Sequence, residues 1–207
     1  MKKIILVAIL AMNLTAAFSQ IEIAIISGAH WENSFGARVG VDVHIPIDNK
    51  MLSFIPGAYW SIRVNEKKGD NLKMIDKANF VSVPLRMGLT IGKNSPYLET
   101  TFFAGPYFAY GVGGKTKFTL DYDGQTNTYE YGSFSDKGLC AKRFDVGVNL
   151  GVNFTIFNHL LLGGFFEYGF MKVKKNTSTI YDPTIQDPFV GNNKNTIGGG
   201  VNIGCRF

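Results

Sequence analysis

An alternation of apolar and polar residues with a period of two recurs in eight segments of this 207-residue sequence. Successive side chains of a β-strand point to opposite faces, so each segment predicts a strand with one apolar and one polar face. In 34–47, Val41 and Val43 share one face, while Arg38 and Asp42 share the other. We therefore expect an all-β protein. The predicted strands are 21–27, 34–47, 51–65, 79–91, 96–113, 142–157, 160–174 and 195–207.

The last of these segments constrains the fold most closely. Ile197, Val201 and Ile203 fall on one face of 195–207, glycine and polar residues fall on the other, and the sequence ends on Phe207. A terminal strand frays unless it is tied into a sheet, and a closed barrel ties it by pairing the last strand with the first. Phe207 is the expected assembly signal, through which this strand would engage the barrel-assembly machinery.

The connections between the predicted strands alternate in length. Turns of about two to four residues follow the second, fourth and sixth strands, while the other connections are roughly 6, 12, 27 and 20 residues long. Bacterial outer-membrane barrels have short periplasmic turns and longer extracellular loops. The sequence thus predicts an eight-stranded antiparallel up-and-down transmembrane β-barrel.

The two faces of the strands differ in charge. One face is almost continuous Val, Ile, Leu and Phe, whereas the other carries glycines and five acids balanced by five arginines, as a paired interior network requires. Trp60, Tyr110, Tyr168 and Phe207 lie at the ends of the apolar face, like aromatic girdles. This favours a lipid-facing apolar surface over the alternative, a soluble barrel with an apolar interior. The expected lumen ion-pair network is Glu22, Arg38, Asp42, Arg63, Arg86, Glu99, Arg143, Asp145, Glu167 and Arg206.

Residues 1–19 have the pattern of a cleavable signal peptide: Lys2 and Lys3, an apolar run over 4–12, and a small-x-small site at 17–19. We expect export and one outer-membrane domain over 20–207. A charged fraction of 18 % and an aromatic fraction of 14 % argue against a disordered or nucleic-acid-binding chain. Cys140 and Cys205 are expected near opposite barrel ends, and hence as free thiols.

Five strand motifs give the sequence a resemblance to a known family. They are VSVPLRMGL at 81–89, PYLETTFFAGPYFAY at 96–110, FDVGVNLGVNF at 144–154, FFEYGF at 165–170 and GGGVNIGCRF at 198–207. With these motifs the sequence resembles the PorT-like outer-membrane β-barrel proteins of Bacteroidetes-type Gram-negative bacteria, often labelled as porins. The resemblance implies an outer-membrane location and an eight-stranded barrel. The name-giving member is associated with secretion and gliding, and no motif here carries that role.

An eight-stranded barrel has a lumen that side chains fill. We therefore expect a non-catalytic integral outer-membrane protein without cofactor or metal, either an envelope structural protein or a binding scaffold. Its expected partners are outer-membrane lipid and an unknown ligand at the long loops 114–140 and 175–194; nucleic acid is not expected. A narrow porin-like channel is one alternative function, and an accessory role in secretion or gliding is another.

An outer-membrane enzyme acting on lipid or protein is the least favoured alternative. Its candidate site is His30 in the first loop, beside Glu32 and Ser34, although residue spacing alone does not define a catalytic triad. His44 is expected on the lumen face and His159 in a periplasmic turn. Within the strands, Pro56, Pro84 and Pro106 predict local bulges.

Overall fold

The computed structural model describes residues 21–32, 34–48, 51–68, 72–92, 95, 97–122, 125–175 and 193–207. The predicted signal peptide and most of the predicted loop 175–194 lie outside these residues. The strands of the described part are β1 (Glu22–Trp31), β2 (Phe35–Asp48), β3 (Leu52–Lys68), β4 (Leu72–Ile91), β5 (Leu98–Tyr122), β6 (Gln125–Gly132), β7 (Phe144–Ile156), β8 (Leu160–Gly169) and β9 (Ile197–Arg206). Among the described residues, no helix is both long and apolar enough to cross a membrane.

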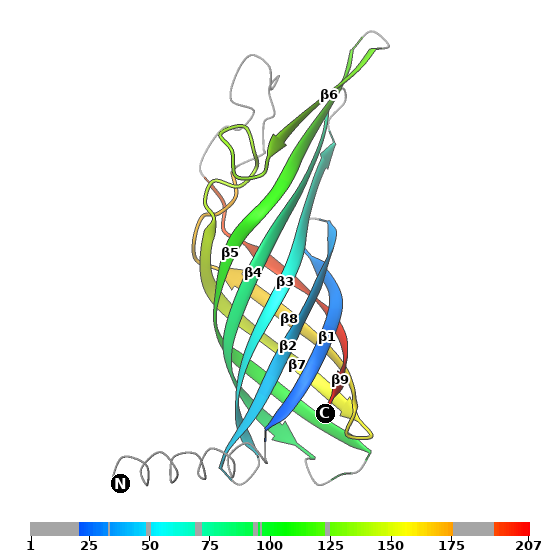
Figure 1. Cartoon of the computed structure of the whole chain (residues 1–207), viewed down its shortest axis with the longest axis vertical. Coiled ribbons are helices and arrows are strands. Elements are labelled where there is room, and N and C mark those ends of the chain that lie inside the picture. Colours follow the sequence, from blue (N-terminus) through cyan, green and yellow to red (C-terminus); the bar gives the residue numbers. More distant parts are fainter. Residues whose placement is uncertain are drawn as a thin grey trace, which may run out of the picture.

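Eight of the strands form a closed antiparallel ring, as the sequence predicts. The sheet order is β4-β3-β2-β1-β9-β8-β7-β5-β6, and an additional β4–β5 pairing closes the ring (Figure 1). The last strand pairs with the first over Ala24↔Arg206 to Trp31↔Gly199, and Phe207 exchanges backbone hydrogen bonds with Ile23. The predicted fold class is therefore confirmed.

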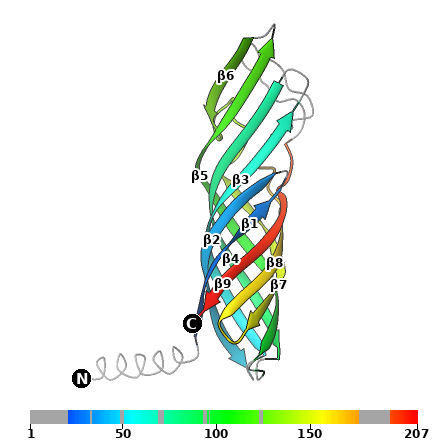
Figure 2. The same cartoon turned by 90° about the vertical axis from the view of Figure 1, so that its right-hand side faces the viewer.

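The wall of the ring is much taller on one side than on the other (Figure 2). We call the end with the β2–β3, β4–β5 and β7–β8 connections the turn end, and the opposite end the loop end. At the loop end β3, β4 and β5 extend beyond their neighbours, and β6 pairs with β5 alone over Lys115↔Gly132 to Tyr122↔Gln125. The 12-residue connection expected after the strand 51–65 and the expected long loop 114–140 are largely strand, so this part of the prediction is wrong.

We call the part of β3, β4 and β5 beyond the ring, together with β6, the extension. In the extension most apolar side chains face inward and most polar ones face outward, the opposite of the arrangement in the ring. Within the ring, apolar residues such as Val81 and Tyr110 face outward, and polar residues face the lumen. Above them, Lys77 and Lys115 face outward, whereas Phe118 faces inward and is fully buried. Lipid covers the apolar outer face of a membrane barrel, and water favours polar side chains. The outward-facing apolar surface therefore ends just below Lys77 and Lys115; we call this surface the apolar belt.

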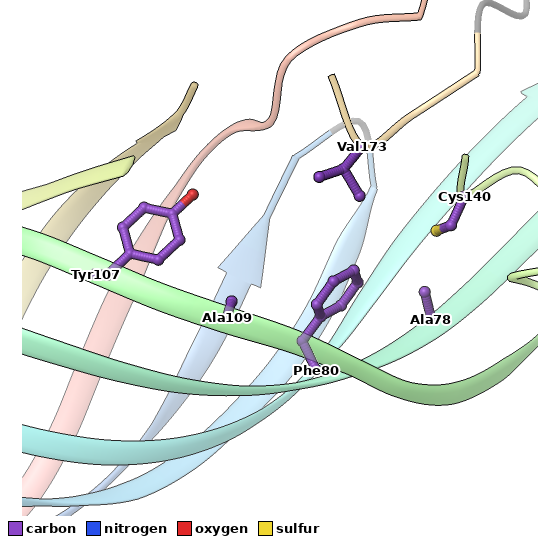
Figure 3. Packing of buried hydrophobic residues seen from close by; sticks show 6 residues of the cluster. All are labelled: Ala78, Phe80, Tyr107, Ala109, Cys140 and Val173. Atoms are coloured by element: carbon purple, nitrogen blue, oxygen red, sulfur yellow. The ribbon is translucent and has the colours of Figure 1, made fainter. Parts of the chain in front are cut away.

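Residues 133–142, together with 171–175, cover the loop end of the lumen, and we call them the cap. Cys140 and Val173 of the cap pack on Ala78 and Phe80 of β4 (Figure 3). The ring of Phe134 lies 5.6 Å from that of Phe80, edge to face. The isolated bridge Cys140↔Lys174 joins the two cap segments, and the bridge Lys174↔Lys194 ties the cap to the segment before β9. The lumen is therefore covered at this end by packed side chains.

The three strand prolines cause no bulge, so that prediction is wrong. The registers run unshifted through Pro56, Pro84 and Pro106. Next to Pro56 the ladders are instead interrupted for two residue pairs, because proline has no N–H to donate. Register shifts occur at Pro46/Asp48 and at Asn79/Phe80, where β5 has one extra residue, Val112.

Both cysteines are free, with Cys140 buried in the cap and Cys205 exposed.

Candidate functional site: the lumen and its cap

Arginine and aromatic side chains fill the middle of the lumen as one continuous stack. The guanidinium carbon of Arg38 lies 3.8 Å from the ring centroid of Tyr59 and 3.9 Å from that of Phe165. Arg86 continues the stack, 5.7 Å from the Tyr59 ring and 4.7 Å from the Phe103 ring. Planar guanidinium groups stack well on aromatic faces, so cation and ring stabilise each other away from water. The stack crosses the lumen from β8 to β5.

Each buried arginine also has an acidic partner. Arg38 Nη1 lies 3.4 Å from Glu167 Oε1, and Arg63 lies 3.5 Å from Asp145 and 3.6 Å from Glu167. Arg86 pairs with Asp42, and both side chains are fully buried. Arg206 lies 3.2 Å from Glu22 and 2.6 Å from Glu99. A buried charge without a partner is costly, so these pairs make the charged lumen compatible with a folded barrel.

The structure thus places nine of the ten proposed network residues in or at the mouth of the lumen, Glu22 being half-buried there. Arg143 does not belong to the network. Its side chain is exposed, its Nη1 donates to the Gly111 carbonyl at 2.9 Å, and its guanidinium lies 4.7 Å from the Phe134 ring. β7 begins at Phe144, so Arg143 lies before the strand, where the alternation no longer governs its direction.

A second polar cluster closes the loop end. Lys174 of the cap forms an ion pair with Glu32 and donates to Asn65 Oδ1 at 3.2 Å. Asp76 lies nearby, fully buried, and accepts a hydrogen bond from Thr116 at 2.6 Å. Burial raises the pKa of Asp76 to about 6, although the Thr116 and Ser133 hydroxyls and Lys174 act in the opposite direction. Burial also raises the pKa of the Cys140 thiol well above its usual range.

The turn end has a cavity of about 320 Å³ around the final arginine. Glu22 and Glu99 contribute carboxylates, and His159 Nδ1 lies 3.2 Å from the Arg206 carbonyl oxygen. Both carboxylates are already paired with Arg206. Among the described residues, no three His, Cys, Asp or Glu side chains gather as a metal site.

His30 lies in β1, not in a loop as predicted, and its side chain is 2 % exposed. Its ring stacks on Phe165 with centroids 5.9 Å apart, and its Nε2 lies 3.7 Å from Glu167 Oε2. Glu32, the expected acidic neighbour, pairs with Lys174 instead. His30 is thus part of the lumen packing. The sequence signal for this position is parity, because His30 shares a face with Ala24 and Ile26.

Sequence reasoning also missed the aromatic half of the lumen. Phe80, Phe103 and Phe165 are buried inside, although Phe is abundant on the lipid-facing side. Parity could have identified them, since Phe103 falls in phase with Glu99 and Phe165 with Glu167. Glycines provide the space: a Cβ at Gly40 would lie 2.4 Å from the Tyr59 ring, and one at Gly151 would lie 2.6 Å from Phe103.

The solved structures with a similar arrangement include two that are named as outer membrane proteins. A major outer membrane protein from Thermus thermophilus has a TM-score of 0.48 and 15 % identity, covering 90 % of this chain and 99 % of that chain. Ail, the attachment invasion locus protein of Yersinia pestis, has a TM-score of 0.41 and 13 % identity, covering 90 % and 96 %. The outer membrane enzyme PagL has a TM-score of 0.39 and 11 % identity, covering 90 % and 98 %. A search of curated proteins gave no significant match.

A family model defines the chain more firmly than these structures do. The model named outer membrane protein beta-barrel domain matches residues 10–175, which include β1 to β8. The β-barrel fold and outer-membrane location of this family agree with the closed ring, the apolar belt and the charged lumen. The chain belongs to the outer membrane protein beta-barrel domain family.

Proposed function

We propose that this protein is a non-catalytic outer-membrane barrel with a closed lumen, which holds a rigid β-sheet extension and cap at its loop end for binding outside the cell. The observation that carries the proposal is the lumen stack of Arg38, Tyr59 and Arg86 with its aromatic neighbours. A side-chain stack across an eight-stranded barrel leaves no wide path for solutes.

The extension supports the scaffold part of the proposal. β3, β4, β5 and β6 form a continuous sheet beyond the apolar belt, and its inner face packs on the cap through Met74, Phe118 and Leu139. A surface built on a packed sheet is preorganised, so little conformational entropy is lost when a partner binds. The extension is thus a more suitable recognition surface than the long polar loop expected from the sequence.

Conductance in planar bilayers tests the closed lumen. The expected result for the wild type is no stepwise current at low voltage. The double variant Tyr59→Ala/Phe165→Ala removes both rings around Arg38, so it is expected to open an ion path and give discrete steps. A matched control, Phe166→Ala, truncates a lipid-facing ring next to Phe165 on β8 and should give no current steps. Steps of equal size in the wild type and in the double variant would instead establish the porin-like alternative.

The absence of catalysis is proposed from the surroundings of His30. A general base needs access to its substrate, and this imidazole is buried between Phe165 and Glu167. His30→Ala should change the stability of the barrel, and neither the variant nor the wild type should hydrolyse lipid A. Hydrolysis of purified lipid A by the wild type, abolished in His30→Ala, would contradict the proposal.

A further inference from the structure

Exposed cations gather at the loop end of the barrel, just beyond the edge of the apolar belt. Lys77 of β4 and Lys115 of β5 are exposed and are direct partners across the β4–β5 ladder. Lys142 and Arg143 precede β7, and Lys172 follows β8; all three are exposed, and the Arg143 guanidinium lies over the Phe134 ring of the cap. We call these five residues the basic rim.

Backbone contacts make the basic rim continuous from β4 to the end of β8. The Gly111 N–H of β5 donates to the Arg143 carbonyl at 2.7 Å, so Arg143 lies directly beside β5. The Ala141 N–H donates to the Val173 carbonyl at 2.6 Å, which brings the segment before β7 against the segment that follows β8. The five cations therefore lie on neighbouring segments of one wall.

The basic rim lies directly above the edge of the apolar belt. Val81, Tyr110, Phe144 and Phe170 are exposed large hydrophobic residues on the same four segments. Val81 pairs with Tyr110, and Tyr110 pairs with Phe144, so they form one row across the wall. Aromatic side chains mark the membrane–water interface of such barrels. The cations therefore lie at the height of the lipid headgroups.

The charges of the basic rim exceed the acidic charge beside it. Like charges directly opposite each other on a ladder destabilise a sheet, and Lys77 and Lys115 are such a pair. In the described part of the chain, the carboxylate that pairs with this region is that of Glu130, which lies 3.2 Å from Lys115 Nζ and 3.8 Å from Lys117 Nζ. An anion between Lys77 and Lys115 would relieve their repulsion.

We propose that the basic rim binds the phosphate groups of the lipids that surround the loop end of the barrel. The apolar belt receives the acyl chains, and the lysines above it reach the phosphates of the same molecules. Each lysine near an anionic membrane surface contributes about 1 kcal/mol of attraction. The inference is independent of the closed lumen, because it concerns only the outer face of the wall.

The test compares two lipids that differ only in the phosphate. Purified protein in neutral detergent is mixed with dioleoyl phosphatidic acid or with dioleoylglycerol, and bound lipid is counted by native mass spectrometry. The variant Lys77→Gln/Lys115→Gln removes the central pair of the rim. The matched control Lys67→Gln/Lys68→Gln removes the same charge from the far end of the extension. Heat-modified mobility on gels verifies that all proteins are folded.

The wild type and the control variant are expected to retain phosphatidic acid in preference to dioleoylglycerol. The rim variant should lose about 10- to 30-fold in affinity for phosphatidic acid, as expected for two lysines, with no change for dioleoylglycerol. An equal loss in the rim and control variants would overturn the proposal, because it would show general charge attraction. Displacement of phosphatidic acid by millimolar inorganic phosphate would also overturn it, because the ligand would then be a soluble anion.

Discussion

Arg86 and Asp42 form a buried ion pair on the inner face of the wall, joining β4 to β2 over the intervening strand β3. On β3 the position between them is Gly57, where a Cβ would lie 2.3 Å from Asp42 Oδ1 and 3.1 Å from Arg86 Nη2. The glycine is thus a requirement of the ion pair, because any side chain at this position would force the two charged groups to move.

Arg86→Leu is expected to destabilise the barrel by about 3–5 kcal/mol, because it leaves Asp42 buried without a cation. Urea unfolding of protein reconstituted in vesicles, followed by tryptophan fluorescence, measures the change. Asp42→Asn/Arg86→Leu should recover part of the loss. Arg143→Leu, a residue outside the lumen network, should cost less than about 0.5 kcal/mol. Equal effects of Arg86→Leu and Arg143→Leu would show that the ion pair contributes little.

Substitutions of Gly111 and Phe134 should have non-additive effects on the cap, because the two residues are in direct contact. A Cβ at Gly111 would lie 2.0 Å from Phe134 Cζ, so Gly111→Ala should push Phe134 away from Phe80 and loosen the cap. Thiol labelling of the buried Cys140, in a Cys205→Ser background, should accelerate about tenfold, which corresponds to about 1.4 kcal/mol of lost cap stability. Adding Gly111→Ala to Phe134→Ala should cause no further acceleration. Additive effects of the two substitutions would contradict direct contact.

Asp76 predicts a pH dependence of cap stability. Its pKa is raised from 3.8 to about 6, so the folded cap binds this proton more tightly than the open chain. The cap should therefore lose stability as the pH rises from about 4 to 6, by at most about 3 kcal/mol. At pH 7.5, Cys140 should be labelled more slowly in Asp76→Asn/Cys205→Ser than in Cys205→Ser alone. Faster labelling would show that the charged carboxylate stabilises the cap.

The tip of the extension should be removable. Replacing 120–127 with a two-residue Asn-Gly turn joins Thr119 to Thr128, which face each other across the β5–β6 ladder. The barrel should assemble normally, as shown by heat-modified mobility. The larger deletion 116–134 should instead disrupt the cap, because it removes Thr116, Phe118 and Phe134, which contact Asp76, Met74 and Phe80. Normal protection of Cys140 in that deletion would contradict this account.

The ring could be predicted from the sequence because lipid makes the strand pattern unambiguous. Val41 and Asp42 face a hydrocarbon phase and a polar lumen, respectively, so alternation fixes both the strand and its direction. Beyond the belt the polar residues of the alternation, such as Lys115 and Lys117, face outward and the apolar ones, such as Phe118, face inward. In the sequence this polar-rich stretch resembles a loop. The extension and the cap were therefore missed. His30 and Arg143 were misplaced for a related reason: strand ends are where the pattern carries least information.

Arg206, on the last strand, has its acidic partners on the first strand of the ring and on β5, in Glu22 and Glu99. Pairing of β9 with β1 therefore brings the guanidinium of Arg206 to both carboxylates at the turn end. Closure of the ring and formation of these two ion pairs are thus one event. A change that keeps β9 from pairing with β1 would therefore remove two ion pairs together with the backbone ladder, so the last strand contributes charge compensation as well as hydrogen bonds.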